Sequence, residues 1–194
     1  MGFFDAFKNT AQSAKNTAAA ASPAAAAANK SETFTYSALP KNLAELKAMP
    51  GADLTNPFAV SALCMAVLAH YEENTEETIE MLNYLKGPEP VNPYQKQFLR
   101  DRLGGKMYVI RSYFAGTSPD NNYTPTVPYT ISIAENPHSY EGGENYVTLH
   151  MQSSGADAPR QIRLRKKPST GQWFVNELLM LSDIRTPKEA DPWA

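Results

Sequence analysis

Four stretches of the chain between residues 128 and 176 alternate apolar and polar residues. Successive side chains of a β-strand point to opposite faces, so each stretch predicts a strand with one apolar and one polar face. The apolar positions are Tyr129, Ile131 and Ile133, then Val147, Leu149 and Met151, then Ile162 and Leu164, and finally Trp173 and Val175. The connections 135–145 and 153–159 are too short for a helical crossover, which takes about a dozen or more residues. We therefore predict an antiparallel meander whose apolar face is covered.

The preceding part of the chain predicts the helices that cover this face. The strongest helix begins at Asn56-Pro57, an N-cap followed by proline at the first helical position, and runs to about residue 73. Its residues are nearly all apolar, so we expect it to be buried. Further elements are predicted as helices over 42–49, 74–86 and 92–103, an edge strand over 33–36, and β structure over the aromatic stretch 107–114. The fold class is α+β, with N-terminal helices packed on one face of an antiparallel β-meander.

Residues 1–20 carry the pattern of a short amphipathic helix. At about 100° per residue, Phe3, Phe4 and Phe7 share one stripe, and Lys8 and Lys15 border it. Such a helix docks on a protein partner or on its own domain, or lies on a membrane surface. A helix this short is also marginal in water, so a frayed tail is the competing interpretation. An alanine-rich linker, 21–32, separates this segment from a single domain over 33–194.

The composition is that of an ordinary globular chain, with 42% hydrophobic residues and a net charge of −2. A charge this close to zero predicts no strong attraction to nucleic acid. The single cysteine, Cys64, excludes an internal disulfide and suits a reducing compartment. No run reaches the roughly 18–20 apolar residues of a membrane span. We expect a cytoplasmic protein that binds no nucleic acid and that associates with a protein partner or a membrane surface through its N-terminal helix.

The usual catalytic motifs are missing from the sequence: there is no P-loop, dinucleotide fingerprint or nucleophile elbow. The three histidines, His70, His138 and His150, are not spaced as metal ligands with Cys64. We therefore predict no catalytic residue, no metal site and no cofactor. A non-enzymatic protein is favoured over an enzyme.

If the chain binds a ligand, the polar face of the meander is the place for it. Tyr146, His150, Arg163 and Arg165 fall on that face and line a concavity if the sheet curls around the helices. RNA-binding sheets pair such basic residues with several stacking aromatics, whereas only Tyr146 accompanies them here. A solvated basic face is the competing interpretation. Helices followed by a curled antiparallel sheet resemble the NTF2-like cone, a likeness of fold that fixes no function.

Several long motifs resemble an uncharacterised bacterial family. They are NPYQKQFLRDR (92–102), SYFAGTSPDNNYTPTVPYTI (112–131), ENPHSY (135–140), APRQIRLRKK (158–167), QWFV (172–175) and DIRTPKEADPWA (183–194). The resemblance is to a domain of unknown function found in Gram-positive anaerobes, and it covers about residues 33–194. It implies a bacterial cytoplasmic protein and no particular activity.

Two functions are compatible with these patterns. The first is a non-enzymatic interaction module whose N-terminal amphipathic helix docks on a partner or membrane. The second is an NTF2-like small-molecule-binding or enzymatic domain with its site on the polar sheet face. Trp193, near the C-terminus, either folds back to cap the core, which we favour, or anchors a partner.

Overall fold

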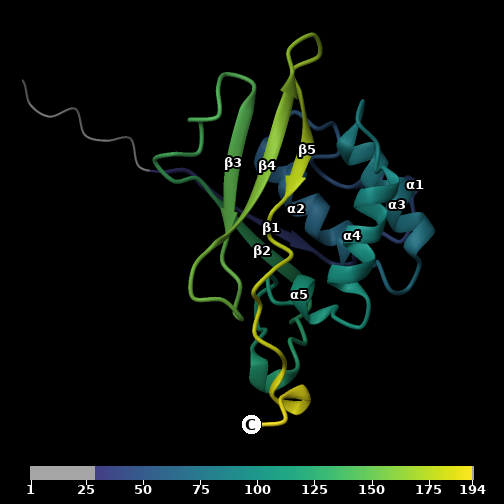
Figure 1. Cartoon of the computed structure of the whole chain (residues 1–194). Coiled ribbons are helices and arrows are strands. Elements are labelled where there is room, and N and C mark those ends of the chain that lie inside the picture. The colour runs from purple at the N-terminus through teal and green to yellow at the C-terminus, as the bar shows by residue number, and fades with distance from the viewer. Residues whose placement is uncertain (1–28, 194) are drawn as a thin grey trace, which may run out of the picture.

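One antiparallel sheet of five strands organises the fold (Figure 1). The computed structural model describes residues 29–193, and within them the strand order β1-β2-β3-β4-β5 follows the chain. The strands are β1 (Ser31–Tyr36), β2 (Tyr129–Ala134), β3 (Tyr146–Met151), β4 (Arg160–Lys167) and β5 (Gln172–Leu178). Every neighbouring pair is antiparallel, which confirms the predicted meander. The predicted edge strand is β1, which begins at Ser31.

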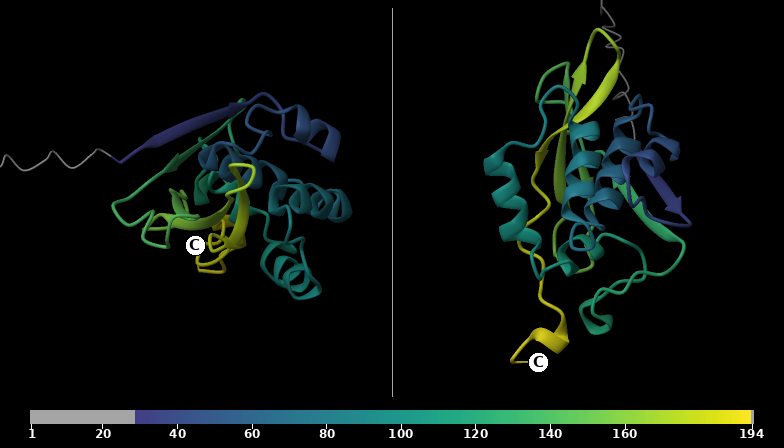
Figure 2. Two further views of the ribbon diagram at one scale, coloured as in Figure 1. Left: turned by 90° about the horizontal axis from the view of Figure 1, so that it is seen from above. Right: turned by 90° about the vertical axis from the view of Figure 1, so that its right-hand side faces the viewer.

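The sheet bends between β2 and β3. These two strands pair only where Ala134 lies opposite His150, whereas β1–β2 and β3–β4 pair along their lengths. Seen from above, β1–β2 and β3–β4–β5 form two wings that open toward the helices (Figure 2). The bend therefore gives the sheet a concave side.

The helices occupy that concave side (Figures 1 and 2). They are α1 (Leu43–Ala48), α2 (Pro57–Leu68), α3 (Thr75–Lys86), α4 (Pro93–Leu103) and α5 (Tyr108–Arg111), with single 3-10 turns η1 (Pro119–Asn121) and η2 (Lys188–Ala190). Helix α2 contacts all five strands, and every residue from Phe58 to Leu68 is buried. On the facing strands, apolar positions such as Ile133, Leu149 and Leu164 are buried as well. The α+β class, with helices covering one face of the meander, is confirmed.

Asparagine side chains begin the three long helices. Asn56 accepts a hydrogen bond from the Phe58 amide, and Asn74 and Asn92 cap α3 and α4 in the same way. The prediction that α2 reaches residue 73 is wrong, because the helix ends at Leu68. Beyond that residue the chain makes tighter turns, in which the His70 amide donates to the Val67 carbonyl.

The predicted β structure over 107–114 is also wrong, because this stretch forms α5 and the turns that follow it. Met107, Val109, Ile110, Tyr113 and Phe114 are all buried, so the stretch packs into the core on more than one face. Aromatic and β-branched residues favoured a strand there by propensity. Tertiary packing overrode that preference.

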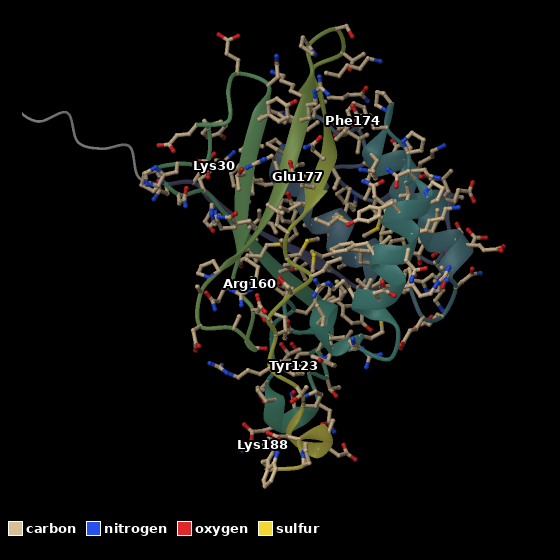
Figure 3. All side chains as sticks on the ribbon, in the orientation of Figure 1. Lys30, Tyr123, Arg160, Phe174, Glu177 and Lys188 are labelled. Atoms are coloured by element: carbon tan, nitrogen blue, oxygen red, sulfur yellow. The ribbon has the colours of Figure 1, made fainter. Side chains whose placement is uncertain are left out.

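After β5 the C-terminal segment adds Met180, Leu181 and Ile184 to the core, and its last residues then leave it. Lys188 and Glu189 of η2 pair with Asp120 and Asn122, at and just after η1, so the tail is held at the lower end of the molecule (Figure 3). Trp193 exposes 93% of its surface, so the interpretation that it caps the core is wrong. Its amide donates to the Asp191 carboxylate, which turns the chain locally.

The predicted amphipathic helix over 1–20, with Phe3, Phe4, Phe7, Lys8 and Lys15, lies outside the described residues, as does most of the linker 21–32. The first contacts that the structure shows are those of Lys30. Its carbonyl accepts from the Glu135 amide, and its ammonium lies 4.8 Å from the centre of the Phe58 ring.

Substitution Gly87→Ala tests how tightly the end of α3 lies against β5. Gly87 has φ of 60°, and a Cβ there would overlap the Phe174 ring. We expect a loss of unfolding free energy of about 2–5 kcal/mol, from left-handed backbone strain and overpacking together. Urea denaturation measures this loss. Gly105→Ala is the matched control: φ is 68° and the space around it is open, so we expect only about 1–2 kcal/mol. Equal losses would contradict a close contact with Phe174.

Candidate functional site

The strand register brings the predicted ligand-binding residues onto one face of the sheet. Tyr146 lies opposite Arg165, and His150 lies opposite Gln161 on the same pair of strands. Arg163 falls between them on β4, opposite Thr148. This face points away from α2, because the alternate positions Val147, Leu149, Ile162 and Leu164 are the buried ones.

Both arginines of this face already hold carboxylates. Arg165 Nη1 lies 3.1 Å from Glu89 Oε1, and its guanidinium carbon lies 5.6 Å from the centre of the Tyr146 ring. Arg163 Nη1 lies 3.0 Å from Glu177 Oε1, on the adjacent β5. These side chains are partly exposed, so the ion pairs organise the surface more than they stabilise the fold.

His150 holds the loop that connects β2 with β3. Its Nε2 lies 3.1 Å from Asn136 Nδ2 and 3.2 Å from Gln161 Nε2. Since both amide groups present N–H donors as oriented, Nε2 accepts and Nδ1 carries the hydrogen. Nδ1 is buried without a partner, and burial lowers the pKa of the imidazole. The histidine is therefore built into the loop in its neutral form.

Tyr146, His150 and Arg163 line none of five cavities on the surface of residues 29–193. Arg165 does line a cavity, but on its β5 side. Ligand binding by the four residues stays a prediction.

A groove that the sequence reasoning missed runs along the outer edge of β5. One part is a cavity of about 210 Å³ between β5 and α4. It is lined by Lys86, Val91, Tyr94, Phe98, Leu178 and Leu179, among others. The second part is a cavity of about 280 Å³ at the other end of β5, with Arg165, Lys166 and Lys167 on its rim. Asn176 lines both, and we call the two together the β5 groove.

Large apolar side chains are exposed beside the first cavity. Tyr94, at the start of α4, exposes 79% of its surface, and Leu179, just after β5, exposes 41%. Farther along α4, Leu99 and Leu103 are buried, so this helix is anchored at its C-terminal end. Its first turn stands away from β5, and the groove lies between them.

Lys86 forms part of the floor of the groove and exposes only 6% of its surface. It is the last residue of α3, and its Nζ donates to the Val175 carbonyl of β5 at 3.4 Å. Burial lowers the pKa of this ammonium. Cys64 lies close by in α2, and burial raises the pKa of its thiol to about 12, so the thiol is neutral.

One sequence signal could have found this lysine. Ile79, Leu82 and Lys86 follow one another at spacings of three and four, so Lys86 occupies the apolar face of α3. A charged residue at a helix end is ordinarily assigned to solvent, and Gly87 directly after it reads as a stop signal. The groove itself arises from segments far apart in the chain, which no local pattern shows.

Three other hollows open on the surface of residues 29–193. A cavity of about 350 Å³ between α5 and the C-terminal segment carries Glu72, Arg111 and Glu189, all exposed. A cavity of about 300 Å³ includes His70 and Tyr129, and one of about 510 Å³ beside β1 and α1 is lined mostly by apolar residues. None of the three is lined by a buried lysine, arginine or carboxylate in the part of the chain that the structure describes. The β5 groove is the better candidate site.

Among the described residues, no group of three or more His, Cys, Asp or Glu side chains is placed to hold a metal ion. No helix between residues 29 and 193 is both long and apolar enough to cross a membrane.

Comparison with known proteins gives one match. A family model described as "Domain of unknown function (DUF6935)" matches residues 38–188. No curated protein and no solved structure matches the chain. The likeness to an NTF2-like cone is therefore not tested by any neighbour of known fold.

Substitution His150→Gln tests the neutral imidazole. Because burial lowers the histidine pKa in the folded protein, the unfolded chain binds the proton more readily. The contribution of His150 is complete above the ordinary pKa of about 6.5 and is lost as pH falls through the lower folded-state pKa. We expect the stability difference between wild type and His150→Gln to shrink as pH falls from about 7.5 to 4.5 in urea titrations. His138→Gln, at an exposed imidazole, is the control. A difference that stays constant with pH would refute this role.

Proposed function

Since the chain belongs to the DUF6935 family, whose description assigns no function, we propose its function from the β5 groove: it is a non-enzymatic interaction module. In this proposal an extended segment of a protein partner lies between β5 and the first turn of α4. The observation that carries it is the pair of exposed apolar residues, Tyr94 and Leu179, beside a cavity on an edge strand.

The size of the cavity favours a partner's side chain over a free small molecule. Sites for drug-sized ligands enclose roughly 300–1,000 Å³. The cavity beside α4 encloses about 210 Å³, which suits one or two side chains projecting from a chain. An exposed tyrosine beside such a pocket is typical of the central contacts of protein interfaces.

The edge position of β5 supports an extended segment. The first half of the outer edge is occupied, because the Trp173 amide donates to the Leu54 carbonyl and the Val175 carbonyl accepts from Lys86. For residues 176–179, the described chain shows no backbone hydrogen bond to α4. An extended peptide can therefore contact the backbone of this half while placing alternate side chains in the cavity.

The basic residues at one end of the groove favour a partner segment of negative charge. Lys166 and Lys167 lie at one end of the groove, next to Arg165. Because these charges meet the incoming chain first, they favour an acidic segment and speed its association. This charge complementarity commits the proposal to an acidic, extended protein segment as the occupant.

The N-terminal segment has a separate place in the proposal. Residues 1–20, with Phe3, Phe4, Phe7, Lys8 and Lys15, dock on a second protein surface or on a membrane, joined to the domain by 21–32. Strand β1, where the domain begins, lies at the opposite edge of the sheet from β5. The segment and the groove can therefore be engaged at the same time, in a bacterial protein of the cytoplasm.

Selection from a random peptide library displayed on phage tests the groove. The full chain is the bait, and Tyr94→Ala/Leu179→Asp, which removes the apolar wall, is the counter-selection bait. We expect peptides that bind wild type at least tenfold more tightly than the double variant, because the exposed wall supplies the central contacts. Fluorescence anisotropy measures both affinities.

Amide chemical shifts locate the selected peptides on the domain. Perturbations confined to β5, α4 and the segment between α3 and α4 are the expected result. Thr33→Ala, on the opposite edge strand, is the control and should leave affinity unchanged. Peptides that bind both baits equally, or that perturb other elements, would overturn the proposal.

Deletion of residues 1–28 tests the independence of the domain. The truncation keeps Lys30 and its contacts with Glu135 and Phe58. We expect the melting temperature to change by less than about 2 °C, because the described core is retained. Co-sedimentation with anionic vesicles or with a docking partner should be abolished. Phe3→Ser/Phe4→Ser/Phe7→Ser, which keeps Lys8 and Lys15, separates apolar insertion from charge attraction. A large fall in melting temperature would show that the segment belongs to the core.

A further inference from the structure

Lys86 is a buried cation without a buried anion. It exposes 6% of its surface, and its Nζ has one hydrogen-bond acceptor, the Val175 carbonyl at 3.4 Å. That distance is at the long end for an N–H···O bond, and an ammonium carries three donors. Within residues 29–193 the lysine forms no ion pair. Burying a charge in this way is costly unless it is paired.

The acidic groups that line the groove are paired with arginines. Glu89, beyond the end of α3, pairs with Arg165 at 3.1 Å. Glu177, on β5, pairs with Arg163 at 3.0 Å. The Cys64 thiol beside the lysine is neutral, since burial raises its pKa to about 12. Neither carboxylate forms an ion pair or hydrogen bond with the ammonium, although the negative charge of Glu89 opposes the lowering of the Lys86 pKa by burial.

We propose that Lys86 is the specificity-determining residue of the β5 groove and that it binds a carboxylate of the partner, next to an apolar side chain of the same segment. This inference rests on the proposed function and specifies the chemical groups of the partner that the groove recognises. The apolar side chain lies among Tyr94, Phe98 and Leu179, and the carboxylate reaches the ammonium at the floor.

The pairing accounts for the position of the lysine. A carboxylate that enters the groove adds a charge-assisted hydrogen bond where the free protein has one long bond to a carbonyl. A partner that lacks the carboxylate leaves the ammonium buried and unpaired, so it is rejected. The partly buried Lys166 and the exposed Lys167 steer the acid toward the groove, whereas Lys86 recognises it.

A pair of small probes tests this directly: 3-phenylpropionate and its neutral amide, 3-phenylpropionamide. Each is titrated into the full chain at constant ionic strength, and amide shifts of β5, α3 and α4 are followed. We expect the acid to bind at these residues at least tenfold more tightly than the amide, because only the acid pairs with the ammonium. Equal affinity of the two probes, or no binding of either at β5 and α4, would overturn the inference.

Substitution Lys86→Met assigns the effect to this residue. Methionine keeps the length of the side chain, and replacing a buried charge by an apolar group is commonly neutral or stabilising, so the variant should fold. We expect it to abolish the preference for the acid while leaving the affinity for the amide within about twofold. Lys167→Met, at the rim, is the matched control and should keep the preference. A preference that survives Lys86→Met would refute the role of Lys86.

The two proposals fail in different ways. If library peptides bind the groove without containing acidic residues, the proposal of an interaction module is retained and the proposal that Lys86 binds a carboxylate is rejected. The comparison of acid with amide in the wild-type chain needs no variant and no selected peptide. It therefore decides the role of the carboxylate even where Lys86→Met is unstable.

Discussion

Burial of α2 inside the bent sheet is the constraint from which the remaining structure follows. From Phe58 to Leu68 this helix has no exposed residue, so it must be enclosed on every side. The sheet encloses one side by bending between β2 and β3, where only Ala134 and His150 pair. Helix α3 covers another side, and its end must then lie close to β5, which is why a glycine stands at position 87 against the Phe174 ring.

This close approach determines where the surface opens. The end of α3 brings Lys86 under β5, where it meets the Val175 carbonyl instead of solvent. The chain then turns away into α4, whose C-terminal half is buried through Leu99 and Leu103 while Tyr94 at its start is exposed. As a result, a space is left open between β5 and the first turn of α4. The candidate site is thus a consequence of how α2 is enclosed, and its buried cation is part of that enclosure.

Local pattern and register account for what the sequence could predict. Period-two alternation located the strands, asparagine caps located the helix starts, and face assignment placed Tyr146, His150, Arg163 and Arg165 together. The stretch 107–114 forms a short helix and turns against its β propensity, because tertiary packing into the core decides its structure. The β5 groove could not be predicted from the sequence, because its walls come from α4, β5 and the end of α3. Only tertiary contacts reveal that Lys86 faces inward.

Ion pairs connect the polar face of the sheet with the β5 groove. The basic run on β4 reads in the sequence as a ligand-binding or solvated face. In the structure, Arg163 and Arg165 form ion pairs with Glu177 and Glu89, carboxylates that themselves line the groove. Because the arginines pair with these acids, neither acid forms an ion pair with Lys86, although the charge of Glu89 still acts on it. In the proposed recognition the arginines therefore act indirectly: they engage the groove's own carboxylates, and a carboxylate of the partner is the group proposed to pair with the buried ammonium.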